Sequence, residues 1–113
     1  MEVRYYIDDQ GRRPVTDWID KIRNKVTKTR ILGRIERLEL GNFGDSKPVG
    51  DGISELRIHF GTGYRVYYSQ QGNEIVLLLC AGDKSTQAHD IADAKAYLEN
   101  YKKRSKTNDK ERT

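Results

Sequence analysis

The chain has 113 residues, with 21 Lys and Arg against 17 Asp and Glu, a length that suits one domain with a single core. Residues 102–113 hold six basic and two acidic side chains, so the rest of the chain has balanced charge and its composition alone does not indicate a nucleic-acid-binding surface. The longest apolar run, residues 75–81, is far shorter than the roughly 20 residues that span a bilayer, and the charged first ten residues lack the apolar segment of a signal peptide. Together with a single cysteine, Cys80, these features predict a cytoplasmic protein without an internal disulfide.

The first half of the chain predicts a strand over residues 2–7 and then two amphipathic helices. The first helix starts at Pro14 and has apolar side chains at helical spacing: Val15, Trp18, Ile19, Ile22 and Val26. The second helix has its own apolar stripe, Ile31, Leu32, Ile35 and Leu38, and a stop signal at Gly41. The two helices should form a hairpin.

The second half predicts a ten-residue loop over residues 43–52, rich in Gly, Asp and Ser, followed by a meander of three antiparallel strands. The strands cover approximately 53–60, 64–70 and 74–81. A last helix begins at Ser85 or Thr86 and turns Ile91, Ala94, Leu98 and Tyr101 inward. The order βααβββα predicts one α+β domain over residues 1–101, with residues 102–113 as a charged, flexible tail.

The first meander strand alternates apolar and cationic side chains. Because neighbouring side chains of a strand point to opposite faces, a core contact by Leu56 and Ile58 places Arg57 and His59 together on the other face. Pairing with the next strand would add Arg65 and Tyr67 to this polar face. Between Ile53 and Gln71 the only carboxylate is that of Glu55, so the face either binds a phosphate or is an ordinary solvated surface.

Three further groups offer cations near this face. Residues 81–91 run from the buried strand into the last helix, where Lys84 and free backbone N–H groups can hold an anion or where Ser85 or Thr86 simply caps the helix. Lys47 in the long loop either reaches the polar face or is solvated. The row Arg30, Arg34 and Arg37 on the second helix is either a solvated stripe or a contact for an acidic partner.

The histidines and the cysteine do not predict a metal site. His59, His89 and Cys80 lack the close paired spacing of metal ligands, and Cys80 lies in an apolar run that predicts burial. We therefore expect no metal and no other cofactor.

The segments "GDSKPVGDGISELRIHFGTGYRVYY" (residues 44–68) and "VLLLCAGDKSTQAHDI" (residues 76–91) resemble the RelE/ParE superfamily of type II toxin–antitoxin toxins, in particular its HigB-like branch of addiction module killer proteins. The resemblance implies a mostly antiparallel, four-stranded sheet with helices packed against it. It also implies a ribosome-dependent mRNA endoribonuclease that arrests translation and is neutralised by a cognate antitoxin, usually a helix-turn-helix protein. Binding to DNA would then be indirect, through the antitoxin complex.

The same resemblance suggests site residues. Its basic catalytic positions match Arg57, His59, Arg65 and Lys84. Contacts to the substrate would come from Lys47, Tyr67 and His89. Near the last helix, where the best-known members place a catalytic tyrosine, this chain has His89 and Asp90, so the sequence does not say which group is the acid and which the base.

Two other functions remain open at this point. A ParE-like inhibitor of DNA gyrase would act by protein binding and would not need a nuclease site. A non-enzymatic RNA- or protein-binding module would keep the fold without any cleavage.

Overall fold

The computed structural model describes the backbone of residues 1–112 and the side chains of residues 1–106. Its centre is a five-stranded sheet in the order β1-β5-β4-β3-β2, antiparallel except for the parallel pair β1 and β5. The strands are β1 (Glu2–Tyr5), β2 (Ser46–Gly50), β3 (Ile53–Ile58), β4 (Tyr64–Gln71) and β5 (Ile75–Asp83). The helices are α1 (Pro14–Asp20), α2 (Lys25–Glu39), the short 3₁₀ helix η1 (Lys84–Thr86) and α3 (Gln87–Arg112).

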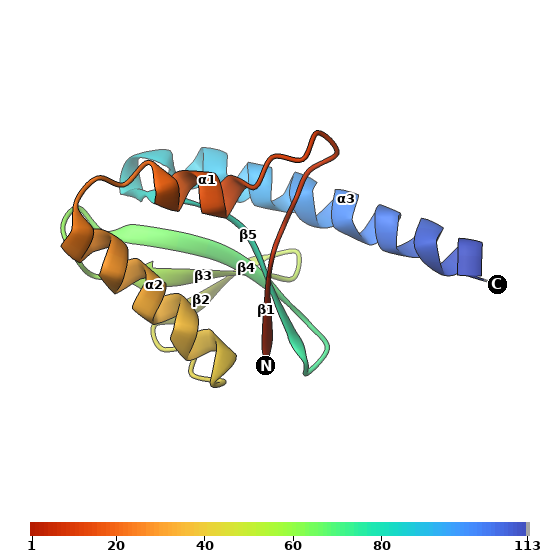
Figure 1. The fold of residues 1–113 in the computed structure, drawn as a ribbon, viewed down its shortest axis with the longest axis horizontal. Helices are drawn as coiled ribbons and strands as arrows, with labels where there is room; N and C mark the ends of the chain where they lie inside the picture. Colours follow the sequence, from red (N-terminus) through yellow and green to blue (C-terminus); the bar gives the residue numbers. More distant parts are fainter. Residues whose placement is uncertain (113) are drawn as a thin grey trace.

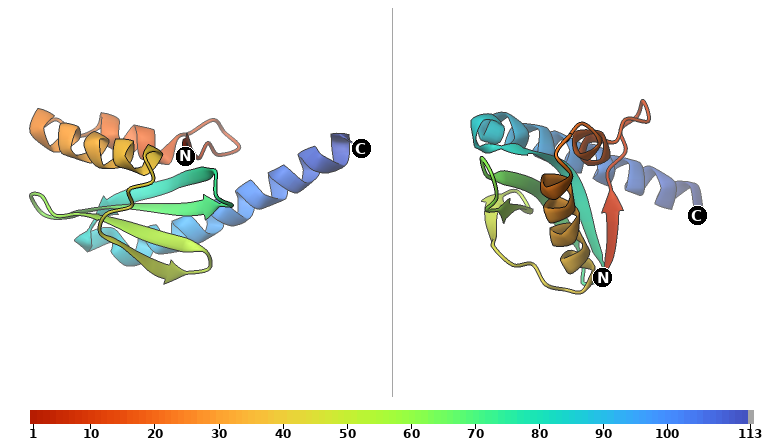
Figure 2. Two further views of the ribbon diagram at one scale, coloured as in Figure 1. Left: turned by 90° about the horizontal axis from the view of Figure 1, so that it is seen from below. Right: turned by 60° about the vertical axis from the view of Figure 1, so that its left-hand side comes forward.

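Helices cover both faces of the sheet. The pair α1 and α2 lies on one face and α3 runs across the other, and α3 projects beyond the sheet at its C-terminal end (Figures 1 and 2). The α3-facing side of β5 includes Leu77 and Leu79, whereas Val76 and Leu78 face the helix pair. Both sets are buried, which explains why the sequence of β5 is apolar throughout rather than alternating.

The core under the helix pair follows the predicted periodicity. Ile31, Ile35 and Leu38 of α2 are buried against strand residues that include Leu56 and Val66. On the opposite face, Ala94 and Leu98 of α3 are buried as predicted. The α+β class is thus confirmed, with two helices on one face of a sheet that is mostly antiparallel (Figure 2).

The prediction of four strands was wrong, because part of the expected loop over residues 43–52 forms the edge strand β2. Lys47 pairs with Glu55 and Pro48 with Ser54 in an antiparallel ladder on β3, with a register shift before Gly50. Proline and glycine made the segment resemble a loop, yet an edge strand accepts a proline because one of its two sides needs no backbone donor.

The first helix is shorter than its apolar spacing predicted. It ends at Asp20, and α2 begins at Lys25 after its N-cap Asn24, whose side chain accepts a hydrogen bond from the backbone N–H of Thr27 at 3.0 Å. Val26 therefore belongs to α2 and is 57% exposed rather than part of the core stripe of α1. The N-cap at Asn24 accounts for the break.

The last helix starts and ends differently from the expectation. The short helix η1 precedes α3; Asp83 is the N-cap of η1, and Thr86 completes a capping box with it. The helix continues through the segment that the sequence assigned to a flexible tail and reaches Arg112; Thr113 and the side chains beyond residue 106 lie outside the described part of the chain. Within that part, none of the helices is both long and apolar enough to cross a membrane.

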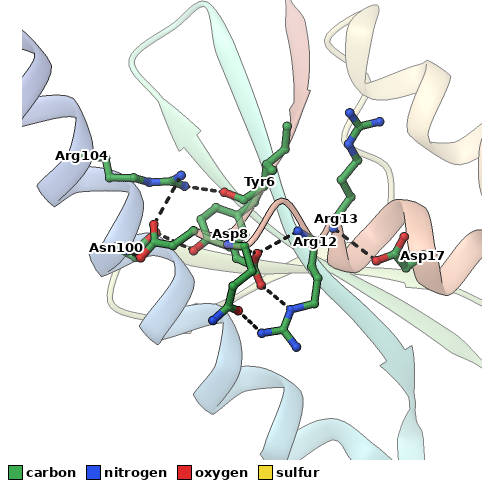
Figure 3. Close-up of polar contacts among 10 residues, drawn as sticks. Tyr6, Asp8, Arg12, Arg13, Asp17, Asn100 and Arg104 are labelled. Atoms are coloured by element: carbon green, nitrogen blue, oxygen red, sulfur yellow. Dashed lines mark hydrogen bonds and ion pairs between the residues drawn. The ribbon is translucent and has the colours of Figure 1, made fainter.

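Contacts with the N-terminal loop fix the middle of α3 (Figure 3). The rings of Tyr6 and Tyr97 stack with centroids 4.8 Å apart, and the Tyr6 hydroxyl donates to Asn100 Oδ1 at 2.7 Å. Arg104 donates to the backbone carbonyl of Ile7 and lies 3.7 Å from Asp9. These contacts explain why the helix does not end at Tyr101.

Gly82 provides a test of the packing between β5 and the start of α3. A Cβ at this position would overlap Asp90 Oδ2 and Thr86 Oγ1, two atoms that share a hydrogen bond of 2.6 Å. We expect Gly82→Ala to lower the free energy of unfolding, measured in urea, by about 1–3 kcal/mol. Gly33→Ala in α2, where a Cβ meets nothing within 4 Å, is the control and should raise that free energy by about 0.5–1 kcal/mol. Equal changes in the free energy of unfolding for the two variants would contradict the close packing of Gly82 against Asp90 and Thr86.

Candidate functional site

A groove of approximately 690 Å³ lies between α2 and the end of β3. It is lined by Lys25, Val26, Thr29, Arg30, Gly33, Arg34 and Arg37 of α2, and by Asp45, Arg57, Ile58, His59 and Phe60. Among these described residues, Asp45 is the one carboxylate, facing five Lys and Arg side chains and a histidine. The groove therefore has a strong excess of positive charge and suits a polyanion.

His59 and Asp45 form a pair at the mouth of the groove. The strand β3 ends at Ile58, so His59 lies in the following loop, where its Nε2 contacts Asp45 Oδ2 and its side chain is 73% exposed. The hydrogen bond from His59, and then the positive charges of Arg57 and Arg34, lower the pKa of Asp45 despite partial desolvation. Because Asp45 is ionised and accepts, the neutral form of His59 that fits this contact donates from Nε2 and has Nδ1 as its proton acceptor.

Two α2 arginines are held in place by specific contacts. Arg34 donates to the backbone carbonyl of Arg57 at 3.4 Å and lies against Gly44, where a Cβ would overlap its guanidinium. The guanidinium of Arg30 lies over the ring of Phe60, 4.8 Å from its centroid. Both side chains thus extend from the helix toward the end of β3.

A buried ionic cluster occupies the opposite face of the sheet, beneath the start of α3. The side chain of Glu55 is 3% exposed; it pairs with Arg65, lies 3.8 Å from Nε of Arg57, and accepts a hydrogen bond of 3.2 Å from Gln87. Arg65 is itself only 13% exposed. The cations of this face are therefore largely engaged by Glu55, which corrects the expectation of an open polar face.

Tyr67 is fully buried in the same layer, so its predicted contact with a substrate is contradicted. Its exposed fraction is 0%, and its hydroxyl has no hydrogen-bond partner among the described residues. Burial, and secondarily the charge of Glu55, raises the pKa of the hydroxyl far above its ordinary value. The covering helix α3 is the reason, since the alternation of the sequence does not show which face of a sheet a later helix covers.

The remaining predicted residues lie around the groove rather than in it. Lys84 is exposed in η1, with its Cε 3.9 Å from the position of a Cβ on Gly63, and so lies at the same end of the sheet as His59. Lys47 is exposed on β2 opposite Glu55, on the α3 side. His89 is exposed on α3 and pairs with Asp93 at 3.2 Å. None of these three lines the groove as described.

Of the predicted catalytic set, the groove contains Arg57 and His59, and neither Arg65 nor Lys84. The residues that the prediction did not place at the site are Lys25, Asp45 and Phe60, together with the α2 row Arg30, Arg34 and Arg37. The i, i+4, i+7 spacing of that row was the signal in the sequence, but nothing there showed that β3 faces it. No group of three or more His, Cys, Asp or Glu side chains suited to a metal ion occurs among residues 1–106.

The fold and the groove define a small α+β protein with a cationic groove beside its sheet. Over residues 17–112 the chain matches the family described as "Phage derived protein Gp49-like (DUF891)", and it belongs to this family, which is associated with type II toxin–antitoxin modules. Membership implies a cognate antitoxin as partner. A protein of Haemophilus influenzae described as "Uncharacterized protein" is 56% identical over 78 residues, which are 69% of this chain and 79% of that relative.

The Glu55 cluster predicts that Arg65 is needed for stability. Replacing it leaves a carboxylate buried with only Arg57 and Gln87 beside it, so we expect Arg65→Ala to lower the free energy of unfolding by about 3 kcal/mol. The exposed Lys47→Ala is the matched control and should change it by less than about 0.5 kcal/mol. Chemical denaturation measures both; similar values for the two variants would contradict the assignment of Arg65 to the cluster.

The lowered pKa of Asp45 predicts that this residue stabilises the fold near neutral pH and that the effect is lost in acid. A carboxyl whose pKa is lower in the folded than in the unfolded state stabilises the fold above the unfolded pKa of about 4, and loses this effect as the pH falls through the folded pKa. The difference in urea midpoint between the wild type and Asp45→Asn should therefore shrink between about pH 5 and pH 2. In a His59→Ala background the difference should already be small at pH 5. A difference that grows on acidification would be inconsistent with the pair.

Proposed function

We propose that this protein is the toxin of a type II toxin–antitoxin module, of the RelE/ParE superfamily and its HigB-like branch, and that it cleaves mRNA on the ribosome. The observation that carries the proposal is the groove in which an exposed histidine, oriented by a carboxylate, lies among five Lys and Arg side chains. Membership of a toxin–antitoxin family agrees with it. The partners would be a cognate antitoxin of the helix-turn-helix type and translated mRNA in the cytoplasm, with DNA bound only through the antitoxin complex.

The proposed reaction needs no cofactor, because the RNA supplies its own nucleophile. The ribose 2′-oxygen attacks the adjacent phosphorus while Nδ1 of His59 takes its proton, and Asp45 holds the ring through Nε2. The bond from phosphorus to the 5′-oxygen breaks, and that oxygen takes a proton from water. The products are a 2′,3′-cyclic phosphate and a 5′-hydroxyl.

The cations beside the His59–Asp45 pair would stabilise the charge that develops on the phosphate. Arg34 and Arg57 lie beside the His59–Asp45 pair, and a guanidinium can donate two parallel hydrogen bonds to phosphate oxygens. Lys84, at the same end of the sheet, would act on the flanking phosphate. Arg65 would contribute indirectly, by neutralising Glu55 beneath Arg57.

His59→Ala tests the proposed activity. A general base contributes typically about 10²- to 10⁴-fold to a rate, so cleavage sites within translated frames should become undetectable in this variant. The measurement is primer extension on cellular mRNAs after brief induction of the wild type, of His59→Ala and of Lys28→Ala. Lys28 is the control, since it lies on α2 beside Tyr5 and Thr16, away from the groove.

Other outcomes of the same experiment would reject the proposal. Growth arrest with intact mRNA and with DNA damage would indicate a ParE-like inhibitor of gyrase. Neither arrest nor cleavage would indicate a non-enzymatic binding module. Because removal of Arg65 is expected to destabilise the fold, Arg65→Ala is unsuitable as the diagnostic variant.

A further inference from the structure

The cations of α2 form a row along the groove, well beyond the His59–Asp45 pair. Lys25, Arg30, Arg34 and Arg37 all line the groove. At about 1.5 Å of rise per residue the row extends roughly 18 Å along the helix axis. A nucleic-acid strand advances about 3.4 Å per phosphate in a duplex and more when extended, so the row can face several successive phosphates.

An aromatic ring lies beside this row. Phe60 is partly buried at the edge of the core and lines the groove, with the guanidinium of Arg30 4.8 Å from its ring centroid. Unpaired bases stack on aromatic rings and on guanidinium planes, whereas the bases of a duplex are not free to do so. A cationic row next to such a pair is therefore typical of a site for a single strand.

We propose that α2 and Phe60 form a subsite for single-stranded RNA next to the bond that is cleaved. Lys25, Arg34 and Arg37 hold phosphates, and the Arg30–Phe60 pair stacks an unpaired base. This inference rests on the proposed function for the choice of RNA as the ligand. An acidic peptide would use the cations but would not need the stacked pair, so the observations favour RNA.

Binding of a short fluorescein-labelled 2′-O-methyl oligouridylate, which lacks the attacking hydroxyl, tests the subsite at several salt concentrations. Removing one phosphate contact should reduce the slope of log affinity against log salt by about 0.7, which we expect for Arg34→Ala. Phe60→Leu should weaken binding by about 5- to 150-fold and leave the slope unchanged. Lys28→Ala, on the other side of α2, should bind as the wild type does.

A second variant guards against misfolding at Phe60, which touches the core. Arg30 is exposed, so Arg30→Ala should fold normally and weaken binding through the loss of a stacking partner. Thermal unfolding of each variant identifies any loss that comes from the fold. If folded Arg30→Ala and Arg34→Ala bind the oligonucleotide as tightly as Lys28→Ala does, the subsite is overturned.

Primer extension in cells expressing the same variants separates this inference from the proposed function. Wild-type cleavage combined with unchanged RNA binding in Arg30→Ala would overturn the subsite alone, because Arg30 has no part in the proposed chemistry. Absent cleavage combined with α2-dependent binding would overturn the endonuclease and support the subsite. If the wild type binds poly-glutamate through these arginines and does not bind the oligonucleotide, the surface is one for an acidic protein and the RNA subsite is overturned.

Discussion

The ion pairs and the hydrogen bond of the buried Glu55 carboxylate hold together the end of the sheet that carries His59. The carboxylate lies on β3, pairs with Arg65 of the neighbouring strand, approaches Arg57 and accepts a hydrogen bond from Gln87 at the start of α3. A single buried charge thus connects two strands and the helix that covers them. Removing one partner of such a group is costly, because the remaining charge cannot be hydrated. The loop that carries His59 leaves the sheet from this fixed end.

The cationic side chains divide into two groups by the face of the sheet to which they belong. Arg65 lies beneath α3, where its charge serves the packing of that face. The α2 arginines and His59 lie on the other side, around an open groove. Arg57 joins the two groups: it lines the groove and lies 3.8 Å from Glu55, and its Nε is buried without a hydrogen-bond partner among the described residues. The core ionic cluster therefore sets the position of one of the groove's own cations.

Periodicity was sufficient to predict two helices before the meander, the three central strands and the inward face of α3, because those features arise from local spacing of apolar residues. It failed where the outcome depends on distant partners. The edge strand β2 forms by pairing with β3, although its Pro48 and Gly50 are typical of loops. Likewise the alternation of β3 and β4 showed which residues share a face, but not that α3 would bury Tyr67 on that face. The α2 row was visible as a pattern, and only the packed fold brings it opposite Phe60 and Asp45.

The parallel pairing of β1 with β5 sets an order of assembly. Glu2 pairs with Ile75, and α1 packs on β5. The native contacts of β1 and α1 therefore cannot form before β5 is present. Contacts of such long sequence separation form slowly, because a long loop must close before they gain anything. During synthesis the N-terminal third therefore leaves the ribosome without its main neighbour, and the layered fold is completed only after β5 emerges. A nascent chain that ends before β5 thus lacks the strand that pairs with both β1 and β4, and its sheet remains divided until residues 75–83 are in place.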